Sequence, residues 1–448
     1  MQDFFKALHV DEVDQSELEL VIQSHFRFAH APNPYEIRYG PHDPHEQPPP
    51  ALIVRYGRKS GRITNIEPGP SLGSDDITQI AEKVQALLLN ASEFCIGQVV
   101  MFSRLPLNGW FRYRDRFQLI PVPPEAPRPD PGMWAVGGFP LLLQYRFAGS
   151  PDPSLQNLRR FNTHRELELL CSALSQHIEG AIPPMVRYHW FTRTSGDPPQ
   201  QFTEFGPEGY GWPAFSGGLA PEYSSVDAWK VVRRIPHEEY YQQPNLWVGA
   251  DLMLPETFEW LLDAYFQRDP EERDRFIRAS HWYQFANYGA AGGYATGRYS
   301  ALCSAVETLM GPEPSHQKKC SRCGRTVGGG VSRRFRQFLE QWAPGPSISA
   351  ADRTRLYGLR SKVTHGGRLL HSDRFGWGVA FSPGRLQDWA DFSAMQLLVR
   401  VILINWLAGA DGSGTAKNRR SSSKECLHFV LRWVRRALAE IGLSGLSP

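Results

Sequence analysis

Two side chains suited to chemistry on a phosphodiester stand five positions apart in the segment LYGLRSKVTHGG, residues 356 to 367. Arg360 has a permanent positive charge and a planar set of donors that matches phosphoryl oxygens, whereas His365 titrates near neutral pH. Cleavage of RNA by its own 2′-hydroxyl needs a group that moves protons and a cation that stabilises the charge developing on phosphorus. The two residue types therefore suit cleavage of a phosphodiester.

The apolar residues around this pair predict an amphipathic helix. Leu356, Leu359 and Val363 recur at helical intervals, and the glycines that follow His365 supply a stop signal. Five residues of regular helix turn through about 500°, so Arg360 and His365 would point roughly 140° apart if the helix were regular. We therefore expect His365 at the frayed or capped end of the helix, where both side chains could reach one substrate.

Both residues also have a purely structural interpretation. Arg360 could pair with a nearby carboxylate, and His365 could cap the last carbonyl groups of its helix. Glu307 lies in an earlier segment of helical pattern, ALCSAVETLM, with apolar residues on both sides, so its carboxylate needs a partner. The residues alone leave open whether Glu307 orients Arg360 or His365, or forms a structural ion pair.

A basic segment precedes the Arg360 helix. Residues 315 to 339 contain seven Lys or Arg and no acidic residue. We expect the basic side chains of this segment, with two more beside the motif, to contact the RNA backbone without reading bases. These residues are Lys318, Lys319, Arg322, Arg325, Arg333, Arg334, Arg336, Lys362 and Arg368. The alternative is a solvated basic loop, which is what most runs of charge are.

The same segment carries a C-x2-C pair, Cys320 and Cys323, which is half of a zinc site. A structural zinc needs four ligands, so His316, a distant cysteine such as Cys303, or the same pair from a second subunit would complete it. The alternative is a redox-labile or inert pair of thiols. We predict a candidate structural zinc here and no cofactor for catalysis.

Composition excludes several classes of protein. The chain has 448 residues, of which 41% are hydrophobic and 12% aromatic, enough for two or three domains with real cores. Its most apolar run, residues 395 to 410, is interrupted by Arg400 and Asn405, and the first residues lack the pattern of a signal peptide. Six cysteines form no disulfide framework in so long a chain. We therefore predict a cytoplasmic protein with no membrane segment.

The chain changes character near residue 253, which predicts an α+β fold in two parts. Residues 1–253 contain short strand-like runs at 51–57, 95–102, 139–147 and 185–191, with a helix at 75–90 and a second helix opened by the capping box THRE at 163–166. From residue 254 to 448 the pattern is helical. We predict a mixed α/β or β-rich first domain and an all-α second domain.

The helical part resembles the HEPN superfamily, and within it the Apea-like group. The resemblance covers residues 255 to 445 and is carried by a helix, the loop YGAAGGYATG, the helix with ALCSAVETLM, a polar insertion, and an arginine separated by four residues from a histidine. It implies a helical bundle with metal-independent endoribonuclease activity. On this resemblance Arg360 and His365 are catalytic, and Glu307 stands where the family has a polar residue that orients them.

The resemblance also implies partners and a setting. Family members dimerise, so a homodimer or higher homo-oligomer would place two motifs face to face and supply both a base and an acid. The Apea-like group resembles microbial anti-phage and growth-arrest ribonucleases, which implies a toxin of abortive infection with residues 1–253 as a sensor or target-recognition domain for an unidentified trigger. The alternative is a catalytically silent HEPN module that binds RNA or nucleotide, or an assembly scaffold.

Overall fold

The structure, a computed structural model, describes residues 14–26, 28–40, 49–58, 61–89, 94–103, 105–122, 139–175, 177–180, 188–191, 202–205, 219–242, 251–287, 295–311, 331–343, 350–374 and 383–409. Its helices and antiparallel sheets confirm the predicted α+β class. The chain divides into two compact units: unit 1 consists of Met1–Gly97, Tyr145–His164 and Leu219–Tyr223, and unit 2 of the remaining residues. A domain boundary at residue 253 stays a prediction.

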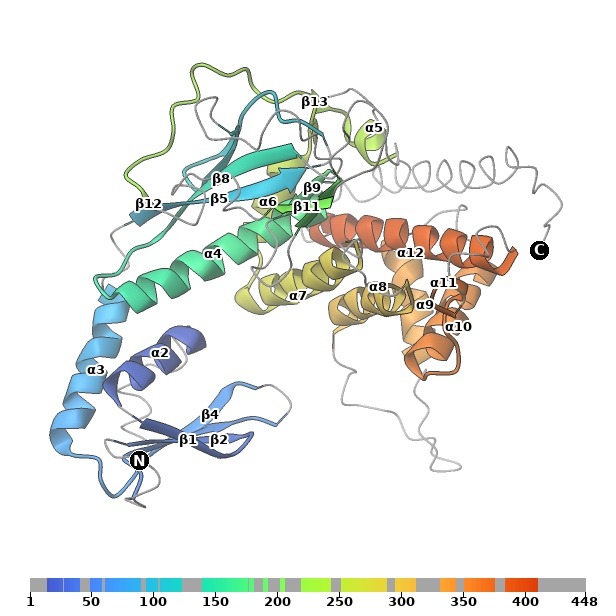
Figure 1. The fold of residues 1–448 in the computed structure, drawn as a ribbon. Helices are drawn as coiled ribbons and strands as arrows, with labels where there is room; N and C mark the ends of the chain where they lie inside the picture. Colours follow the sequence, from blue (N-terminus) through green and yellow to red (C-terminus); the bar gives the residue numbers. More distant parts are fainter. Residues whose placement is uncertain are drawn as a thin grey trace, which may run out of the picture. The chain divides into compact units, whose positions relative to one another are not determined.

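Unit 1 contains an antiparallel sheet of four strands with two helices. The elements are α2 (Gln15–His25), β1 (Phe28–Asn33), β2 (Glu36–Gly40), β3 (Leu52–Tyr56), β4 (Ile63–Pro68) and α3 (Ser74–Leu89), and the strands follow one another in sequence order across the sheet. In Figure 1 these elements are drawn in blue. The strand predicted at 51–57 and the helix predicted at 75–90 are confirmed as β3 and α3.

The core of unit 1 forms because apolar side chains alternate along the strands and recur on the helices. Leu52 and Val54 on β3 are buried together with residues of α2 and α3, such as Ile22 and Ile80. Asp14 begins α2, because its carboxylate accepts hydrogen bonds from the backbone N–H groups of the first helical turn. The two helices and the sheet therefore share one core.

Three elements run across the division of the chain into units: β5 (Phe94–Ser103), β8 (Phe139–Ala148) and α4 (Pro153–Leu174). The first two confirm the strands predicted at 95–102 and 139–147. The capping box predicted at 163–166 is wrong, because α4 already begins at Pro153. The carboxylate of Asp152 caps that helix by accepting from the N–H groups of Ser154 and Leu155, and proline at the first helical position has no N–H to satisfy.

The larger sheet has six strands in the order β12-β5-β8-β7-β6, with β9 also paired to β5. The remaining strands and the one short helix of this region are β6 (Phe111–Tyr113), β7 (Phe117–Pro121), β9 (Ile178–Gly180), β10 (Tyr188–Phe191), β11 (Phe202–Phe205), β12 (Leu219–Ala220), β13 (Arg234–Ile235), α5 (His237–Gln242) and β14 (Leu254–Pro255). Of the strand predicted at 185–191, residues 188–191 form β10, and the residues before them lie outside the described part of the chain.

A row of buried glutamines crosses this sheet within unit 2. The side-chain amide of Gln118 on β7 donates to Oε1 of Gln144 on β8 at 2.6 Å, and the amide of Gln144 donates to Oε1 of Gln98 on β5 at 2.9 Å. Arg112 on β6 extends the row by donating from Nε and Nη2 to Oε1 of Gln118, at 2.9 and 2.6 Å. Successive strands are therefore joined by side chains as well as by their backbones.

Helices follow β14 in unit 2: α6 (Phe258–Phe266), α7 (Pro270–Asn287), α8 (Ala295–Met310), α9 (Val331–Trp342), α10 (Ala350–Thr364), α11 (His371–Arg374) and α12 (Pro383–Ala408). Figure 1 shows α12, in red, running beside α7 and α8, and it packs against both. Buried residues of α12 include Leu398, Ile402 and Leu403. These helices therefore enclose an apolar core of their own.

Helix α12 is also the one described helix that is long and apolar enough to cross a membrane, by length and composition only. The apolar stretch is Leu386–Ala408, and half of it is buried inside the structure. A core helix meets the same two criteria, and the buried residues of α12 pack on neighbouring helices. We therefore interpret α12 as a core helix.

Candidate functional site

Helix α10 holds the Arg360 motif against α8. Leu356, Leu359 and Val363 are buried, which confirms the predicted apolar stripe. The hydroxyl of Tyr299 on α8 donates to the backbone carbonyl of Leu356 at 3.0 Å, inside the buried contact between the helices. This bond and the apolar stripe together fix which side of α10 faces α8.

Arg360 and Glu307 form an ion pair between α10 and α8. Both Nε and Nη2 of Arg360 donate to Oε1 of Glu307, at 2.8 and 2.6 Å. The Arg360 side chain is 13% exposed and the Glu307 side chain 33%, so the pair lies at the edge of the core. Glu307 thus has the partner that its apolar surroundings required, and it fixes the plane of the guanidinium. Either a structural or an orienting role fits this geometry.

His365 directly follows Thr364, the last residue of α10, and is the C-cap of that helix. Gly366 follows it with a backbone φ of +70°, a conformation that glycine adopts without strain. The N–H groups of Gly366 and Gly367 donate to the carbonyls of Val363 and Lys362, at 3.1 and 2.8 Å, which is the hydrogen-bond pattern of a Schellman motif. His365 is therefore at the capped end, as predicted. Its side chain is exposed and makes no hydrogen bond or ion pair with the described residues.

The helical path is regular up to this cap. The N–H of His365 still donates to the carbonyl of Ser361 at 3.1 Å, so His365 leaves the helix where a regular turn would place it. The divergence of roughly 140° between Arg360 and His365 therefore applies. One α10 directs the two side chains to different sides of the helix, and a site that uses both needs a substrate that wraps the helix end or a second copy of the chain.

The predicted RNA-binding residues divide into two groups. Lys318, Lys319, Arg322 and Arg325 lie outside the described residues. The other five are described: Arg333, Arg334 and Arg336 on α9, Lys362 on α10, and Arg368 after it.

Among the described residues of this set, Arg333, Arg336 and Lys362 are exposed. Arg334 is only partly exposed and donates from Nη2 to the carbonyl of Gly311 at 3.3 Å. Arg368 donates from Nη2 to Oδ1 of Asp388 at 2.6 Å, and that carboxylate is buried. A buried counter-charge weakens the field of Arg368 toward solvent, so Arg333, Arg336 and Lys362 have the charge most available to RNA.

Two aspartates of α12 hold α10 and the segment that follows it through contacts that were not predicted from the sequence. Asp388 accepts from Arg368 and, through Oδ2, from the backbone N–H of His371 at 2.5 Å. Asp391, one turn further along, accepts from Arg355 of α10. Both aspartates are buried. The available signal was two carboxylates three positions apart in a helix with many apolar residues, because buried carboxylates require partners.

A cluster of titratable side chains, also missed, lies between α4 and α7 within unit 2. Oε1 of Glu168 accepts from Nη1 of Arg165 at 2.8 Å and from the amide of Gln284 at 2.9 Å. Nη2 of Arg165 lies 2.9 Å from Nδ1 of His281. Burial raises the pKa of Glu168 to about 7, against the opposing effect of Arg165. Burial also lowers the pKa of His281, and Arg165 adds to that effect.

The candidate zinc site falls mostly outside the described residues, where His316, Cys320 and Cys323 lie. Cys303, the distant cysteine considered as a further ligand, is buried in α8, and burial raises the pKa of its thiol. Metal ligation requires the thiolate, so Cys303 is poorly suited to complete the site. The described part of the chain contains no group of three side chains that could hold a metal ion. A structural zinc at Cys320 and Cys323 stays a prediction.

Comparison with protein-family models, with curated proteins and with solved structures finds no match to this chain. The function is therefore inferred from the residues and contacts of the helical site.

Proposed function

We propose that this chain is a metal-independent endoribonuclease of the HEPN type, acting as a microbial anti-phage or growth-arrest effector. The observation that supports this best is the Arg360–Glu307 pair. Glu307 holds the Nε and Nη2 edge of Arg360 at the border of the core, while His365 is exposed at the capped end of the same helix. A fixed cation and an accessible imidazole are the two groups that RNA cleavage requires.

In this mechanism the imidazole of His365 takes the proton from the ribose 2′-hydroxyl or gives one to the departing 5′-oxygen. Arg360 stabilises the negative charge that develops on the phosphoryl oxygens. Glu307 is a positioning residue, because it contacts Arg360 and not the substrate. The products would carry a 2′,3′-cyclic phosphate or 3′-phosphate and a 5′-hydroxyl.

Two copies of the chain would solve the geometric problem of the diverging side chains. Arg360 of one copy and His365 of another can face the same phosphate if two α10 helices meet about a twofold axis. A cleft of this kind would also contain two histidines, one for each proton transfer. We therefore propose a homodimer or higher homo-oligomer as the active form.

Cleavage of total RNA in the presence of EDTA tests the proposed reaction. We expect fragments with 2′,3′-cyclic phosphate or 3′-phosphate ends, identified by end-specific ligation, from the unaltered chain. The Arg360→Ala chain should yield none, and a His30→Ala chain should cleave normally because His30 is an exposed histidine on β1, outside the motif. Strict dependence on Mg²⁺ with 5′-phosphate ends would contradict the proposal.

Mixing two inactive variants tests the composite site. If each site takes Arg360 from one copy and His365 from another, a mixed dimer of Arg360→Ala and His365→Ala chains contains one intact site. Random pairing then restores about a quarter of the activity of the unaltered protein, since half of the dimers are mixed and each has one of two sites. No restoration, with exchange of subunits demonstrated, would mean either that each chain uses its own Arg360 and His365 or that cleavage needs the histidines of both copies in one cleft.

A second candidate is a HEPN module that binds RNA without cleaving it. The observation that favours it is that His365 is exposed and has no orienting partner among the described residues, whereas the Arg360–Glu307 pair by itself also fits a structural ion pair. A catalytic histidine is usually held by a second group. RNA binding that survives in both motif variants, with no cleavage by the unaltered chain under any condition, would favour this candidate.

A further inference from the structure

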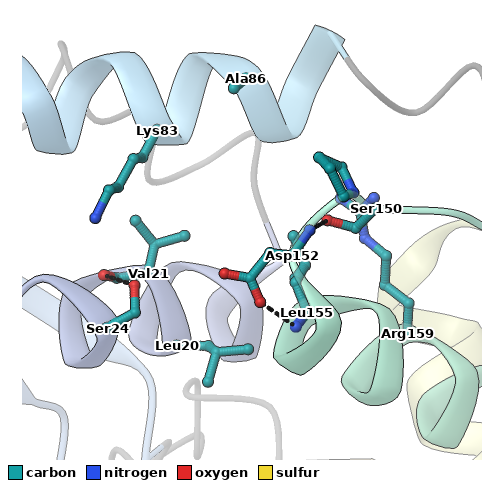
Figure 2. A pocket seen from close by; sticks show the side chains of 10 residues that line it. Leu20, Val21, Ser24, Lys83, Ala86, Ser150, Asp152, Leu155 and Arg159 are labelled. Atoms are coloured by element: carbon teal, nitrogen blue, oxygen red, sulfur yellow. Dashed lines mark hydrogen bonds between the residues drawn. The ribbon is translucent and has the colours of Figure 1, made fainter.

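Unit 1 contains a cavity of about 160 Å³ between α2, α3 and the start of α4. Figure 2 shows the side chains that surround it, with α3 above and α2 below. All of the lining residues belong to unit 1, so the cavity is formed within one compact part of the chain.

The walls of the cavity are mainly apolar. Leu20 and Val21 of α2, Ala86 of α3 and Leu155 of α4 contribute to them. Val21 and Leu155 belong to the buried core of the unit, whereas Ala86 is exposed. An apolar cavity of about 150 Å³ is large enough for a molecule of the size of benzene. The cavity therefore suits an apolar group of about six carbon atoms.

Two of the charged residues at the cavity already have partners. Arg159 donates from Nε and Nη2 to the two carboxylate oxygens of Glu17, both at 2.7 Å, and from Nη1 to the carbonyl of Gly149 at 2.8 Å. Asp152 caps α4 through its contacts with the first N–H groups of that helix, at 2.8 and 3.0 Å. A helix N-terminus also stabilises a negative charge, so the carboxylate of Asp152 needs no further cation.

Lys83 is the third charged residue that lines the cavity. Figure 2 shows it extending from α3 toward Val21 and Ser24 of α2, at the side of the cavity away from α4. Its side chain is exposed and makes no ion pair or hydrogen bond with any described residue. The cavity thus combines apolar walls with one cation that has no counter-ion in the described part of the chain.

We propose that this cavity binds a small monocarboxylate with an apolar body. The hydrocarbon part occupies the space between Leu20, Val21 and Leu155, and the carboxylate pairs with the ammonium group of Lys83. Asp152 borders the same space and would repel a second negative charge, which disfavours dianions such as phosphate. The site is separate from the proposed ribonuclease site, and neither proposal depends on the other.

Hexanoate is the probe for this site, because its tail matches the cavity and its charge matches Lys83. Saturation-transfer NMR on the full chain would measure its binding up to about 10 mM, since so small a ligand is limited to weak affinity. Hexanol of the same length supplies the uncharged comparison. We expect hexanoate to bind, hexanol to bind about fivefold more weakly, and inorganic phosphate to leave the hexanoate signal unchanged.

Three variants locate the binding. Lys83→Met keeps the length of the side chain and removes its charge, and should weaken hexanoate binding about fivefold without affecting hexanol. Lys230→Met removes an exposed lysine of unit 2 and is the matched control, with no expected effect. Ala86→Leu adds bulk at the cavity from an exposed helical position and should abolish the binding of both probes.

Each outcome decides the proposal. The proposal is supported if Ala86→Leu abolishes the binding of both probes, Lys83→Met weakens the binding of hexanoate only, and Lys230→Met changes neither. Undetectable hexanoate binding, equal binding of hexanoate and hexanol, or unchanged binding in Lys83→Met or Ala86→Leu would overturn it. Circular dichroism of the two variants separates a loss of the site from a loss of the fold, and both substituted positions are exposed.

Discussion

The Arg360 site in unit 2 and the cavity in unit 1 differ in how they treat charge. Arg360 is engaged by Glu307 at the edge of the core, and the second functional group, His365, stands exposed at a helix end. The cavity has apolar walls and an ammonium group, Lys83, with no counter-ion among the described residues. The first site has candidate reactive groups at an exposed helix end, and the second is a partly open apolar cavity with one cation at its side.

This difference shows what each site lacks. In the proposed ribonuclease site, Glu307 orients Arg360 before substrate arrives, and the proposed RNA and second copy of the chain would supply the remaining walls. In the proposed carboxylate site, the apolar walls are already formed and the anion would pair with Lys83. The helical site is therefore suited to a large polyanion, and the cavity to a small ligand.

The largest expected effect concerns the exposed group of the first site. His365→Ala should abolish RNA cleavage and any growth arrest on expression, because no other side chain of the motif is an imidazole that can transfer the protons. The fold should survive, since an exposed C-cap residue contributes little to the core. Cleavage assays with purified protein, supported by a thermal unfolding curve, measure both parts. Full activity in the variant would mean that His365 is not a catalytic residue.

Arg360→Lys should have the next largest effect. Lysine keeps the charge but cannot offer two fixed donors to Glu307 or to phosphoryl oxygens. We expect the activation barrier to rise by about 3 kcal/mol, as for the loss of one oriented donor. Single-turnover cleavage at saturating RNA is the measurement. Near-normal rates would indicate that Arg360 attracts RNA through its charge alone.

Glu168 is a buried titratable group, in contrast to the exposed His365 and Lys83 of the two sites. Burial raises its pKa to about 7 in the folded chain, from an ordinary 4.5. The folded state therefore holds this proton more tightly than the unfolded state, so the stabilisation is complete below the unfolded pKa and is lost as the pH rises through about 7.

The Glu168→Gln chain carries no titrating group at that position. We subtract the free energy of unfolding of the unaltered chain from that of the variant. This difference should rise between pH 4.5 and 7 and then level off. The total rise should be about 1.4 kcal/mol for each unit by which the pKa of Glu168 is raised. Urea unfolding of both chains at a series of pH values measures the difference. A difference independent of pH would mean that Arg165 and Gln284 keep Glu168 ionised throughout.

The smallest expected effect concerns the exposed charges around the first site. Arg333→Gln should lower the slope of log affinity against log salt by about 0.7 for single-stranded RNA, equally for different sequences. Arg334→Gln is the informative companion, because Arg334 is half-buried and bonded to the carbonyl of Gly311. Filter binding at several salt concentrations distinguishes the two. An unchanged slope in Arg333→Gln would show that α9 does not contact the RNA backbone.

Local patterns in the sequence predicted much of the fold. Short strand-like runs identified β3, β5 and β8, and helical spacing identified α3 and the buried stripe of α10, because these signals depend on neighbours within one element. The start of α4 was misplaced by ten residues because THRE has the form of a capping box while Asp152 performs the capping. A local motif cannot show that an earlier cap has already started the helix.

Contacts between residues far apart in the sequence were harder to predict. The two glycines predicted that His365 lies at the end of α10. The sequence did not decide whether Glu307 contacts Arg360, and the structure shows that it does. The contact of Arg368 with Asp388 joins the segment between α10 and α11 to α12, and no spacing within one element indicates it. The cavity was not predicted at all, since three separate helices form it and its residues share no motif.

The glutamine row of the six-stranded sheet has a consequence for folding. If β8 paired one residue out of register, Leu143 would replace Gln144 between its neighbours, and the buried amides of Gln98 and Gln118 would lose their shared partner. Each unsatisfied buried amide costs about 1–3 kcal/mol, whereas an exchange of one apolar residue for another at the same place costs little. The amides thus penalise misaligned strands that apolar packing alone would tolerate, and they specify a single register for β5, β8 and β7.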